Sequence, residues 1–267
     1  MEITEHAIRI LETVAMEVQA RFTDFGDLAH GFEHTHRVYH LALHLAAKEP
    51  ADGLSVGMAA LLHDLGRSTR GPMRSHAEHS AKLAQKLLAP YDFPLDTQHA
   101  ILHAIQAHSF RHGIEPATLE ARVLYDADRL DSLGACGVMR WAMTAKHGRL
   151  PQTRTYHADD PFALWREPDG QHYLLDRFFT KHLQLAEAMT TATGCAMAER
   201  ASPFCACTCT NSSMNWQREE MAMICRKRSR MVCCGTRKEQ QQEKLAEDLQ
   251  GGRVVAIHRN YDEQHSA

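Results

Sequence analysis

Histidine and aspartate residues stand on the apolar faces of separate helical patterns in this sequence. The first pattern spans residues 31–48, where His34 continues a stripe of apolar side chains at steps of four, three and four residues. The other members of this stripe are Val38, Leu41 and Leu45. A polar side chain on such a stripe points toward the interior of a helical bundle. The pattern therefore predicts an all-α protein in which His34 faces inward.

Two further patterns bring acidic groups to the same interior. Residues 56–65 are almost wholly apolar until the adjacent pair His63 and Asp64, and a helix of this kind is normally buried on all sides. Residues 119–133 carry three aspartates within six positions, with Asp128 in the middle. Buried carboxylates without a partner are costly and neighbouring carboxylates repel each other. Both patterns therefore predict a cation among these groups.

Together these residues offer two imidazoles and two carboxylates. This mixed set of His34, His63, Asp64 and Asp128 suits a divalent transition metal better than a cysteine-rich or all-oxygen cage does. We expect Mn²⁺ first, with Co²⁺, Ni²⁺ and Mg²⁺ as alternatives. The chemistry that such a set favours is metal-assisted hydrolysis.

Around the predicted ligands, the sequence resembles the HD-domain metal-dependent phosphohydrolases. The four ligands meet the pattern H…HD…D, and the signatures EHTHRV, AALLHDLGR, HAEHSA, AIQAHSF and LYDADRLDSLGACGV resemble those of the YedJ/YpgQ-type branch. The resemblance covers residues 5–200 or so and implies an HD-domain helical bundle with its metal site between helices. It also implies nucleotide pyrophosphohydrolase activity, which cleaves (deoxy)nucleoside triphosphates to monophosphate and pyrophosphate.

Two other functions stay open at this stage. A nucleotide phosphomonoesterase would release orthophosphate instead of pyrophosphate. A non-catalytic HD module would sense a nucleotide or a metal, but the complete set of four ligands speaks against it. In either hydrolase the spare oxygen of Asp64 or Asp128 would orient or deprotonate the attacking water, and the sequence does not choose between them.

Further residues are predicted to contact the phosphates of a small-molecule substrate. His103 and His108 match histidines of the resembling family, and we assign them to phosphate contact or to protonation of the leaving group. The alternative is a pair of helix histidines with satisfied hydrogen bonds. Arg67 and Lys181 are the predicted cationic clamps, because phosphate binding needs fixed positive charge near the metal; solvated surface residues are the alternative. Arg129 is predicted to pair with Asp126 or Asp131.

Other histidines receive structural interpretations. The segment that begins at His76 matches the family, but the sequence does not require a ligand there. His36, His40 and His44 recur at four-residue spacing and indicate a solvated or partly buried stripe. His30 is followed by glycine where relatives often have aspartate, so the group that supports the ring of His34 is not evident.

Composition agrees with a cytoplasmic enzyme built on one main domain. The chain has 267 residues, of which 44% are hydrophobic, and no apolar run is long enough for a membrane span or a signal peptide. A net charge of −3 argues against a surface that coats nucleic acid. We therefore expect no nucleic-acid or membrane partner, while a homodimer stays open.

Apolar periodicity and helix breakers predict seven helices. Their ranges are 4–22, 33–48, 54–65, 76–88, 94–108, 117–146 with a break near Leu133–Gly134, and 172–193. The connection over residues 148–170 exceeds the usual loop length and is predicted to close over a substrate. Cys136 is predicted to be a small buried hydrophobe.

The chain changes character near residue 200, so we divide it into an HD hydrolase domain, residues 1–200, and a cysteine-rich and polar tail, residues 201–267. Seven of the eight cysteines follow Gly194, but their spacing lacks the C-x₂-C pattern of a zinc site. Suitable codons for residues 201–216, entered one nucleotide earlier, read RQPLLRVYLHQLLDEL, which is an amphipathic helix that continues the preceding segment. We therefore interpret the tail as frameshifted and poorly ordered, without a selected function.

Overall fold

The fold consists of helices joined by short turns and one longer loop. In the computed structural model, the described residues are 3–23, 26–27, 29–69, 75–109, 113–146 and 154–210. The helices are α1 Glu5–Arg21, α2 Phe32–Ala46, α3 Gly53–Leu62, η1 Leu65–Ser68, α4 His76–Leu88, α5 Leu95–Ala107, α6 Leu119–Leu130, α7 Gly134–Lys146, α8 Leu174–Thr180, η3 His182–Gln184 and α9 Ala192–Thr210. Over these ranges the β-structure amounts to an isolated bridge between Arg154 and Tyr173. The predicted all-α class is confirmed.

Four of the helices begin at side chains that cap their first turn. Thr4, Asp52, Ser75 and Thr118 each accept a hydrogen bond from the backbone N–H three residues later. These bonds satisfy N–H groups that have no partner inside the helix, which fixes where α1, α3, α4 and α6 start. The predicted starts at residues 4, 54 and 76 lie within one residue of the observed ones.

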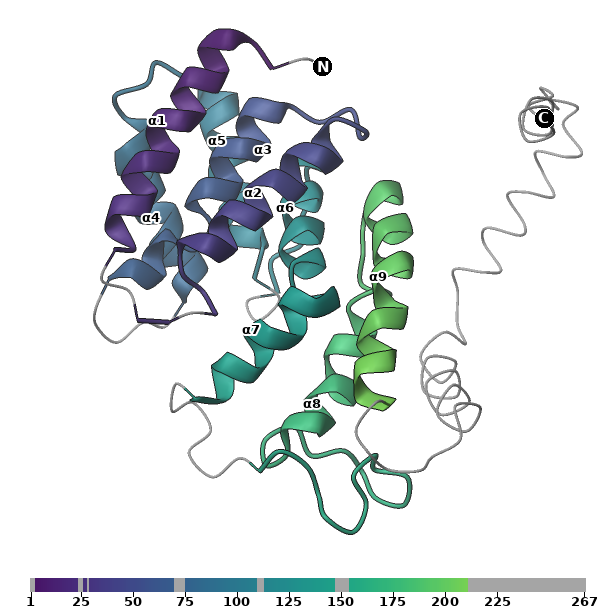
Figure 1. Cartoon of the computed structure of the whole chain (residues 1–267). Coiled ribbons are helices and arrows are strands. Elements are labelled where there is room, and N and C mark those ends of the chain that lie inside the picture. The colour runs from purple at the N-terminus through teal and green to yellow at the C-terminus, as the bar shows by residue number, and fades with distance from the viewer. Residues whose placement is uncertain are drawn as a thin grey trace, which may run out of the picture. The chain divides into compact units, whose positions relative to one another are not determined.

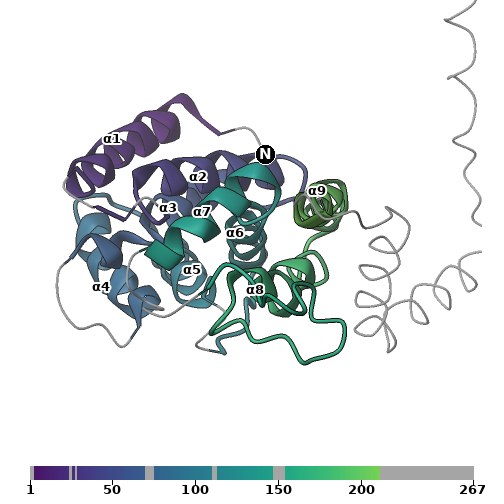
Figure 2. The same cartoon turned by 60° about the horizontal axis from the view of Figure 1, so that its bottom comes forward.

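Helix α3 lies at the centre of the bundle. Nine of its residues are buried, as the almost continuous apolar run predicts. It packs against α1, α2, α5 and α6, and α4 packs against α5. Figure 1 shows this group of helices, and Figure 2 shows α1 and α4 on the side of the bundle opposite α9. The metal ligands predicted on α2, α3 and α6 therefore come from three helices in mutual contact.

The segment after the bundle differs from the prediction. Instead of one helix over residues 172–193, the chain forms α8, η3 and a new helix α9 that begins at Ala192. The cause is the buried carboxylate of Asp126 on α6, which accepts hydrogen bonds from the backbone N–H and the hydroxyl of both Thr190 and Thr191. This contact ends the preceding turns and starts α9 against α6, so the predicted continuous helix is wrong.

Helices α6 and α7 are separate, as predicted. Gly134, with φ of +67°, lies at the break, and this backbone conformation favours glycine. The prediction for Cys136 is wrong, because this side chain on the first turn of α7 is exposed to solvent. Among the described helices, no helix is both long enough and apolar enough to span a membrane.

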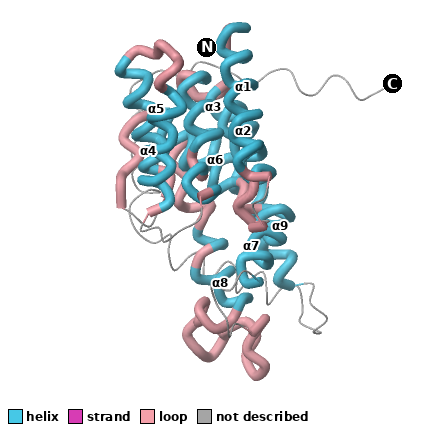
Figure 3. Tube along the Cα trace, turned by 90° about the vertical axis from the view of Figure 1, so that its left-hand side faces the viewer, coloured by secondary structure: helices cyan, strands magenta, loops and turns pink. Residues whose placement is uncertain are grey.

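The described part of the long loop, residues 154–173, has a fixed internal network. The buried Asp176 of α8 accepts hydrogen bonds from the guanidinium of Arg166 and from the backbone N–H of Asp169. The loop is the pink stretch below α8 in Figure 3. At its surface the indole of Trp165 is 81% exposed. Residues 148–153 lie outside the described residues, and closure of this loop over a substrate stays a prediction.

Helix α9 spans the predicted domain boundary at residue 200 and ends at Thr210. The remainder of the predicted tail, residues 211–267, lies outside the described residues. The division into a hydrolase domain and a frameshifted tail therefore stays a prediction.

Candidate metal centre

The four predicted ligands converge from three helices. His34 lies on the first turn of α2, His63 caps the C-terminus of α3 with Asp64 directly after it, and Asp128 lies on the last turns of α6. The Nε2 atom of His34 is 3.3 Å from Nε2 of His63, 3.4 Å from Oδ1 of Asp128 and 3.8 Å from Oδ2 of Asp64. The side chains of His34, His63 and Asp64 are at most 3% exposed, whereas that of Asp128 is 27% exposed.

Hydrogen bonds on the outer side of each ring fix which nitrogen carries the proton. Nδ1 of His63 lies 2.7 Å from the carbonyl oxygen of Ala60. Because a carbonyl oxygen can only accept, Nδ1 is the donor and the neutral ring keeps a bare Nε2. Nδ1 of His34 lies 2.8 Å from the carboxylate of Asp131, which imposes the same assignment. Both rings therefore turn Nε2 toward the centre.

This arrangement fits a cation. When both rings are neutral, their two bare nitrogens 3.3 Å apart repel each other, and neither can donate a hydrogen bond to the other. A cation that both nitrogens share removes the repulsion, and the carboxylates of Asp64 and Asp128 supply the negative charge that it needs. The donor set of His34, His63 and Asp128 is itself close enough to hold a metal ion.

The pKa values of the ligands agree with a cation site. Burial and nearby Arg140 lower the pKa of His34, but hydrogen bonds to Asp128 and Asp131 outweigh them, and its pKa lies above the usual value. Burial lowers the pKa of His63 to about 4. Burial would raise the pKa of Asp64, but Arg67 and the surrounding histidines hold it well below its usual range. Without metal, a proton on His34 is therefore the positive charge that the cluster favours.

A second group of donors shares His63 with the first. His63, Asp64 and His108 are all buried and are also close enough together to hold a metal ion. Nε2 of His108 is 3.8 Å from Oδ1 of Asp64, and Nε2 of His76 is 3.6 Å from the same oxygen. The Nε2 atoms of His76 and His108 are 3.2 Å apart. The structure thus brings His108 to the ligands, as predicted, and adds His76, which the sequence left without a role.

A glycine allows this approach of α4. The backbone N–H of Gly66, two residues after Asp64, donates to the hydroxyl of Ser80 at 2.9 Å. A Cβ at Gly66 would lie 2.8 Å from the backbone oxygen of His76, which is too close for any side chain. Glycine at this turn therefore permits His76 to lie beside Asp64. In the sequence, the only indication of this close approach is the glycine at position 66, two residues after Asp64.

Arg67 pairs with the ligand Asp64. Its Nε atom is 2.7 Å from Oδ1 of Asp64, and its side chain is 16% exposed. The predicted cation therefore lies at the edge of the site, joined to one oxygen of Asp64 while the other oxygen faces the histidines. A guanidinium has five N–H groups, so Arg67 keeps donors beyond this ion pair.

Sequence reasoning missed the role of Asp131. Its carboxylate, with its side chain 2% exposed, accepts hydrogen bonds from His34 on α2, from Arg37 on α2 and from Arg140 on α7. The sequence signal was the position of Asp131, three residues after Asp128, but only the fold pairs it with His34. Arg129, which was predicted to pair with Asp126 or Asp131, instead donates to the backbone oxygen of Tyr125 at 2.8 Å. That prediction is wrong because both carboxylates have other partners.

Two predicted substrate residues lie elsewhere. The ring of His103 is half-buried and accepts a hydrogen bond from the backbone N–H of Ala117 at 3.1 Å. Five residues along a helix rotate a side chain by roughly 140°, so His103 and His108 point in different directions. Lys181 is exposed at the C-cap of α8, a helix that is drawn below the bundle in Figures 1 and 3. His103 has no described contact with the four predicted ligands.

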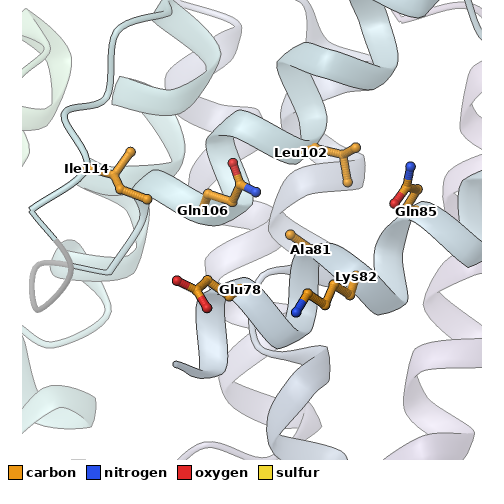
Figure 4. A pocket seen from close by; sticks show the side chains of 7 residues that line it. All are labelled: Glu78, Ala81, Lys82, Gln85, Leu102, Gln106 and Ile114. Carbon is orange, nitrogen blue, oxygen red and sulfur yellow. The ribbon is translucent and has the colours of Figure 1, made fainter. Parts of the chain in front are cut away.

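A hollow on the surface between α4 and α5 is separate from the cluster. Its volume is about 340 Å³, and Figure 4 shows the side chains that line it. They are Glu78, Ala81, Lys82, Gln85, Leu102, Gln106 and Ile114. None of them was a predicted site residue, so this hollow does not account for the chemistry of the cluster.

Comparison with known proteins agrees with this geometry. Residues 31–133, which include all four ligands, His76 and His108, match the HD domain family. The chain contains an HD domain. Its sequence is 29% identical over 200 residues to the uncharacterized protein YpgQ of Bacillus subtilis, an alignment that covers 72% of this chain and 87% of YpgQ. The chain is therefore similar to YpgQ along most of its length and carries the HD domain of a superfamily of metal-dependent phosphohydrolases.

A solved structure of YpgQ and one further relative complete the comparison. The crystal structure of B. subtilis YpgQ in complex with ADP matches with a TM-score of 0.57 and 28% identity, over 74% of this chain and 90% of that one. Ribonuclease Y of Thermoanaerobacter pseudethanolicus is 34% identical over 122 residues, but these cover 44% of this chain and only 21% of the ribonuclease. The similarity to YpgQ extends along most of both chains, whereas the similarity to ribonuclease Y is confined to one part of a longer protein.

Proposed function

We propose that this protein is a metal-dependent nucleotide pyrophosphohydrolase that cleaves (deoxy)nucleoside triphosphates to a monophosphate and pyrophosphate. The observation that carries the proposal is the buried cluster of two histidines and two carboxylates with Arg67 at its edge. Such a cluster combines a cation site with fixed positive charge for phosphate oxygens. The similarity to YpgQ, whose structure holds ADP, supports a nucleotide as the substrate. We place the enzyme in the cytoplasm, without nucleic-acid or membrane partners.

His34, His63, Asp64 and Asp128 are the proposed metal ligands, with Mn²⁺ as the metal. When bound, the ion polarises a phosphate oxygen and lowers the pKa of a coordinated water. Neutral imidazole nitrogens and carboxylate oxygens are a ligand set that Mn²⁺ accepts, although Co²⁺ and Ni²⁺ also fit it.

Asp128 is the proposed residue that orients the attacking water. One oxygen of Asp64 is 2.7 Å from Arg67 and the other is 3.8 Å from Nε2 of both His34 and His63, so both of its oxygens already face other members of the cluster. Asp128 uses Oδ1 toward His34, and its side chain is partly exposed. Burial would raise the pKa of Asp128, but the hydrogen bond from His34 and the other histidines lower it well below its usual value. A carboxylate of low pKa accepts a hydrogen bond from water but is a weak base, so it orients the water more than it deprotonates it.

Arg67 and His108 are the proposed contacts of the phosphate chain. Arg67 has N–H groups beyond those it gives to Asp64 and lies at the partly exposed edge of the site. His108 donates through Nδ1 to the carbonyl oxygen of Ile105 and turns Nε2 toward Asp64. Burial lowers the pKa of His108, so its Nε2 carries a proton only when additional negative charge, such as a phosphate, is close.

The deciding experiment identifies both the products and the bond that breaks. Protein stripped of metal and reloaded with Mn²⁺ is incubated with deoxynucleoside triphosphates and monophosphates in water enriched in ¹⁸O. Pyrophosphate and orthophosphate are measured separately, and the ¹⁸O label is located by mass spectrometry. Attack at the α-phosphorus puts the label into the nucleoside monophosphate and leaves the pyrophosphate unlabelled.

Three outcomes have different meanings. Unlabelled pyrophosphate that disappears in the Asp64→Asn variant supports the proposal. Orthophosphate from monophosphates, without pyrophosphate from triphosphates, replaces it with a phosphomonoesterase. Binding of Mn²⁺ and nucleotide without any turnover replaces it with a sensing module.

A further inference from the structure

The carboxylate of Asp131 joins three elements at the back of the metal centre. Its Oδ2 atom is 2.8 Å from Nδ1 of His34 on α2 and 2.7 Å from Nη1 of Arg140 on α7. Its Oδ1 atom is 2.7 Å from Nε of Arg37, one turn after His34. The side chain is 2% exposed, so water does not compete for these contacts.

His34 differs in this respect from its neighbours. His63 and His108 each donate through Nδ1 to the carbonyl oxygen three residues earlier on their own helix, at 2.7 and 2.6 Å. His34 stands on the first turn of α2, whose N-cap residue is Gly31, and its Nδ1 contacts a side chain 97 positions away in the sequence. The local backbone therefore fixes the tautomer of two rings, and a distant side chain fixes that of the third.

We infer that Asp131 is a positioning residue that holds His34 in the Nδ1–H tautomer and so presents the Nε2 lone pair to the metal. Arg37 and Arg140 keep the carboxylate in place and charged, because each donates to it from a different helix. A metal-bound histidine whose other nitrogen donates to a carboxylate is fixed in orientation and is a more basic ligand. The inference rests on the proposed metal site, but the tautomer of His34 can be measured without metal.

Asp131→Asn tests this role with little change in volume. An amide presents one oxygen and one NH₂ group to three donors, and the orientation that turns its NH₂ group toward Nδ1 of His34 also turns it toward Nη1 of Arg140. That orientation requires the Nε2–H tautomer, which cannot bind a metal through Nε2. The variant therefore permits the tautomer that the aspartate excludes.

The matched control is Asp27→Asn. Asp27 lies 2.8 Å from Nδ1 of His30, which is the same distance as in the pair of Asp131 and His34. His30 is not one of the proposed ligands. Both variants lose one carboxylate from a histidine pair, but only Asp131→Asn should affect the metal centre.

The first measurement is the tautomer of His34 in metal-free protein labelled with ¹⁵N-histidine. Long-range ¹H–¹⁵N correlation spectra distinguish the two neutral tautomers, and His34→Gln assigns the signals. The spectra are taken at a pH where titration of the ring signals shows that His34 is neutral. We expect the Nδ1–H tautomer in the wild type and in Asp27→Asn, and a mixture or the Nε2–H tautomer in Asp131→Asn.

The second measurement is the dissociation constant for Mn²⁺ by calorimetry, with thermal unfolding of the metal-free variants to verify folding. We expect Asp131→Asn to weaken metal binding by about 10- to 100-fold, and Asp27→Asn to leave it unchanged. An unaltered tautomer in folded Asp131→Asn overturns the inference, as does unaltered metal affinity. Failure of the wild type to bind Mn²⁺ instead overturns the proposed metal site, and the tautomer spectra still decide the role of Asp131 toward His34. If Asp131→Asn does not fold, the spectra of the folded wild type decide, because the Nε2–H tautomer of His34 in that protein overturns the inference.

Discussion

The two sides of the candidate metal centre are built differently. On one side, His63 and His108 sit at the C-terminal ends of α3 and α5, and carbonyl oxygens of their own helices fix their rings. On the other side, the ring of His34 depends on Asp131, which also binds Arg37 and Arg140. Backbone support exists for any sequence that forms the helix, whereas side-chain support disappears with one substitution. The His34 side is therefore the side of the site that substitutions on other helices can disturb.

Loss of Asp64 should have the largest effect because this residue stands between the two sides. Asp64→Asn removes charge that faces four histidines and Arg67. Support of a ligand is worth about 10- to 100-fold in metal affinity, so loss of a charged ligand should cost more than about 100-fold, with a matching loss of pyrophosphate release. Calorimetry with Mn²⁺ and a pyrophosphate assay measure both effects.

The matched control for Asp64→Asn is Asp176→Asn, which breaks another buried pair of aspartate and arginine. Asp176 pairs with Arg166 in the segment after the bundle and has no contact with the cluster among the described residues. This variant should lower stability by about 3–5 kcal/mol while Mn²⁺ affinity is retained. Equal loss of metal affinity in both variants would show that the effect of Asp64→Asn is loss of folding and not loss of a ligand.

His108→Gln and His34→Gln distinguish the two candidate donor groups. If the metal lies in the His34 group, His34→Gln loses the ion, whereas His108→Gln retains one equivalent and loses about 10²- to 10⁴-fold in kcat, the range of a general acid or base. Metal content after gel filtration and steady-state kinetics report the two quantities. Loss of the metal in His108→Gln would move the site to the group that contains Asp64, His63 and His108.

The pH dependence of metal binding should come from the His34 side. The pKa of His34 is raised above its usual value, so below this pKa a proton occupies the ring and must leave before the metal binds. The pKa of His63 is lowered to about 4, so this ligand stays neutral above that pH. Metal affinity should therefore fall by about tenfold per pH unit as the pH drops below the pKa of His34, with one proton released per metal. Two protons released near pH 6 would contradict this assignment.

The smallest effect is expected for His103. Its ring accepts a hydrogen bond from Ala117 and points away from His108. His103→Gln should change the free energy of unfolding by less than about 0.5 kcal/mol and leave kcat and KM unaltered. A drop in kcat as large as that of His108→Gln would restore His103 to the site, as the sequence first indicated.

Much of the bundle could be predicted from local patterns. The start of α4 at Ser75 and the break at Gly134 follow from a capping hydroxyl and from a glycine, both visible in the sequence. The second half of the chain could not be predicted equally well. Helix α9 starts where Thr190 and Thr191 meet Asp126, more than 60 positions earlier, and no local pattern encodes such a contact.

The same distinction holds for the candidate site. His34, His63, Asp64 and Asp128 could be identified because a charged or polar side chain on an apolar helical face is conspicuous within a single segment. His103 could not be excluded in the same way, because the rotation between two residues on one helix matters only once the position of the centre is known. The position of His76 beside Asp64 likewise depends on how closely α4 approaches Gly66.

The sequence by itself determined the helical class, the candidate metal-binding residues and the resemblance to HD-domain proteins, because helix periodicity, capping and motif spacing act over a few residues. Only the tertiary structure decided the partners of these residues. It pairs Asp131 with His34 and Asp126 with the start of α9, and each of these pairings depends on how two helices meet. Asp126, Asp128 and Asp131 are equivalent in the sequence, but their neighbours in the fold differ. Asp126 binds the start of α9, Asp128 faces Nε2 of His34, and Asp131 binds Nδ1 of the same ring.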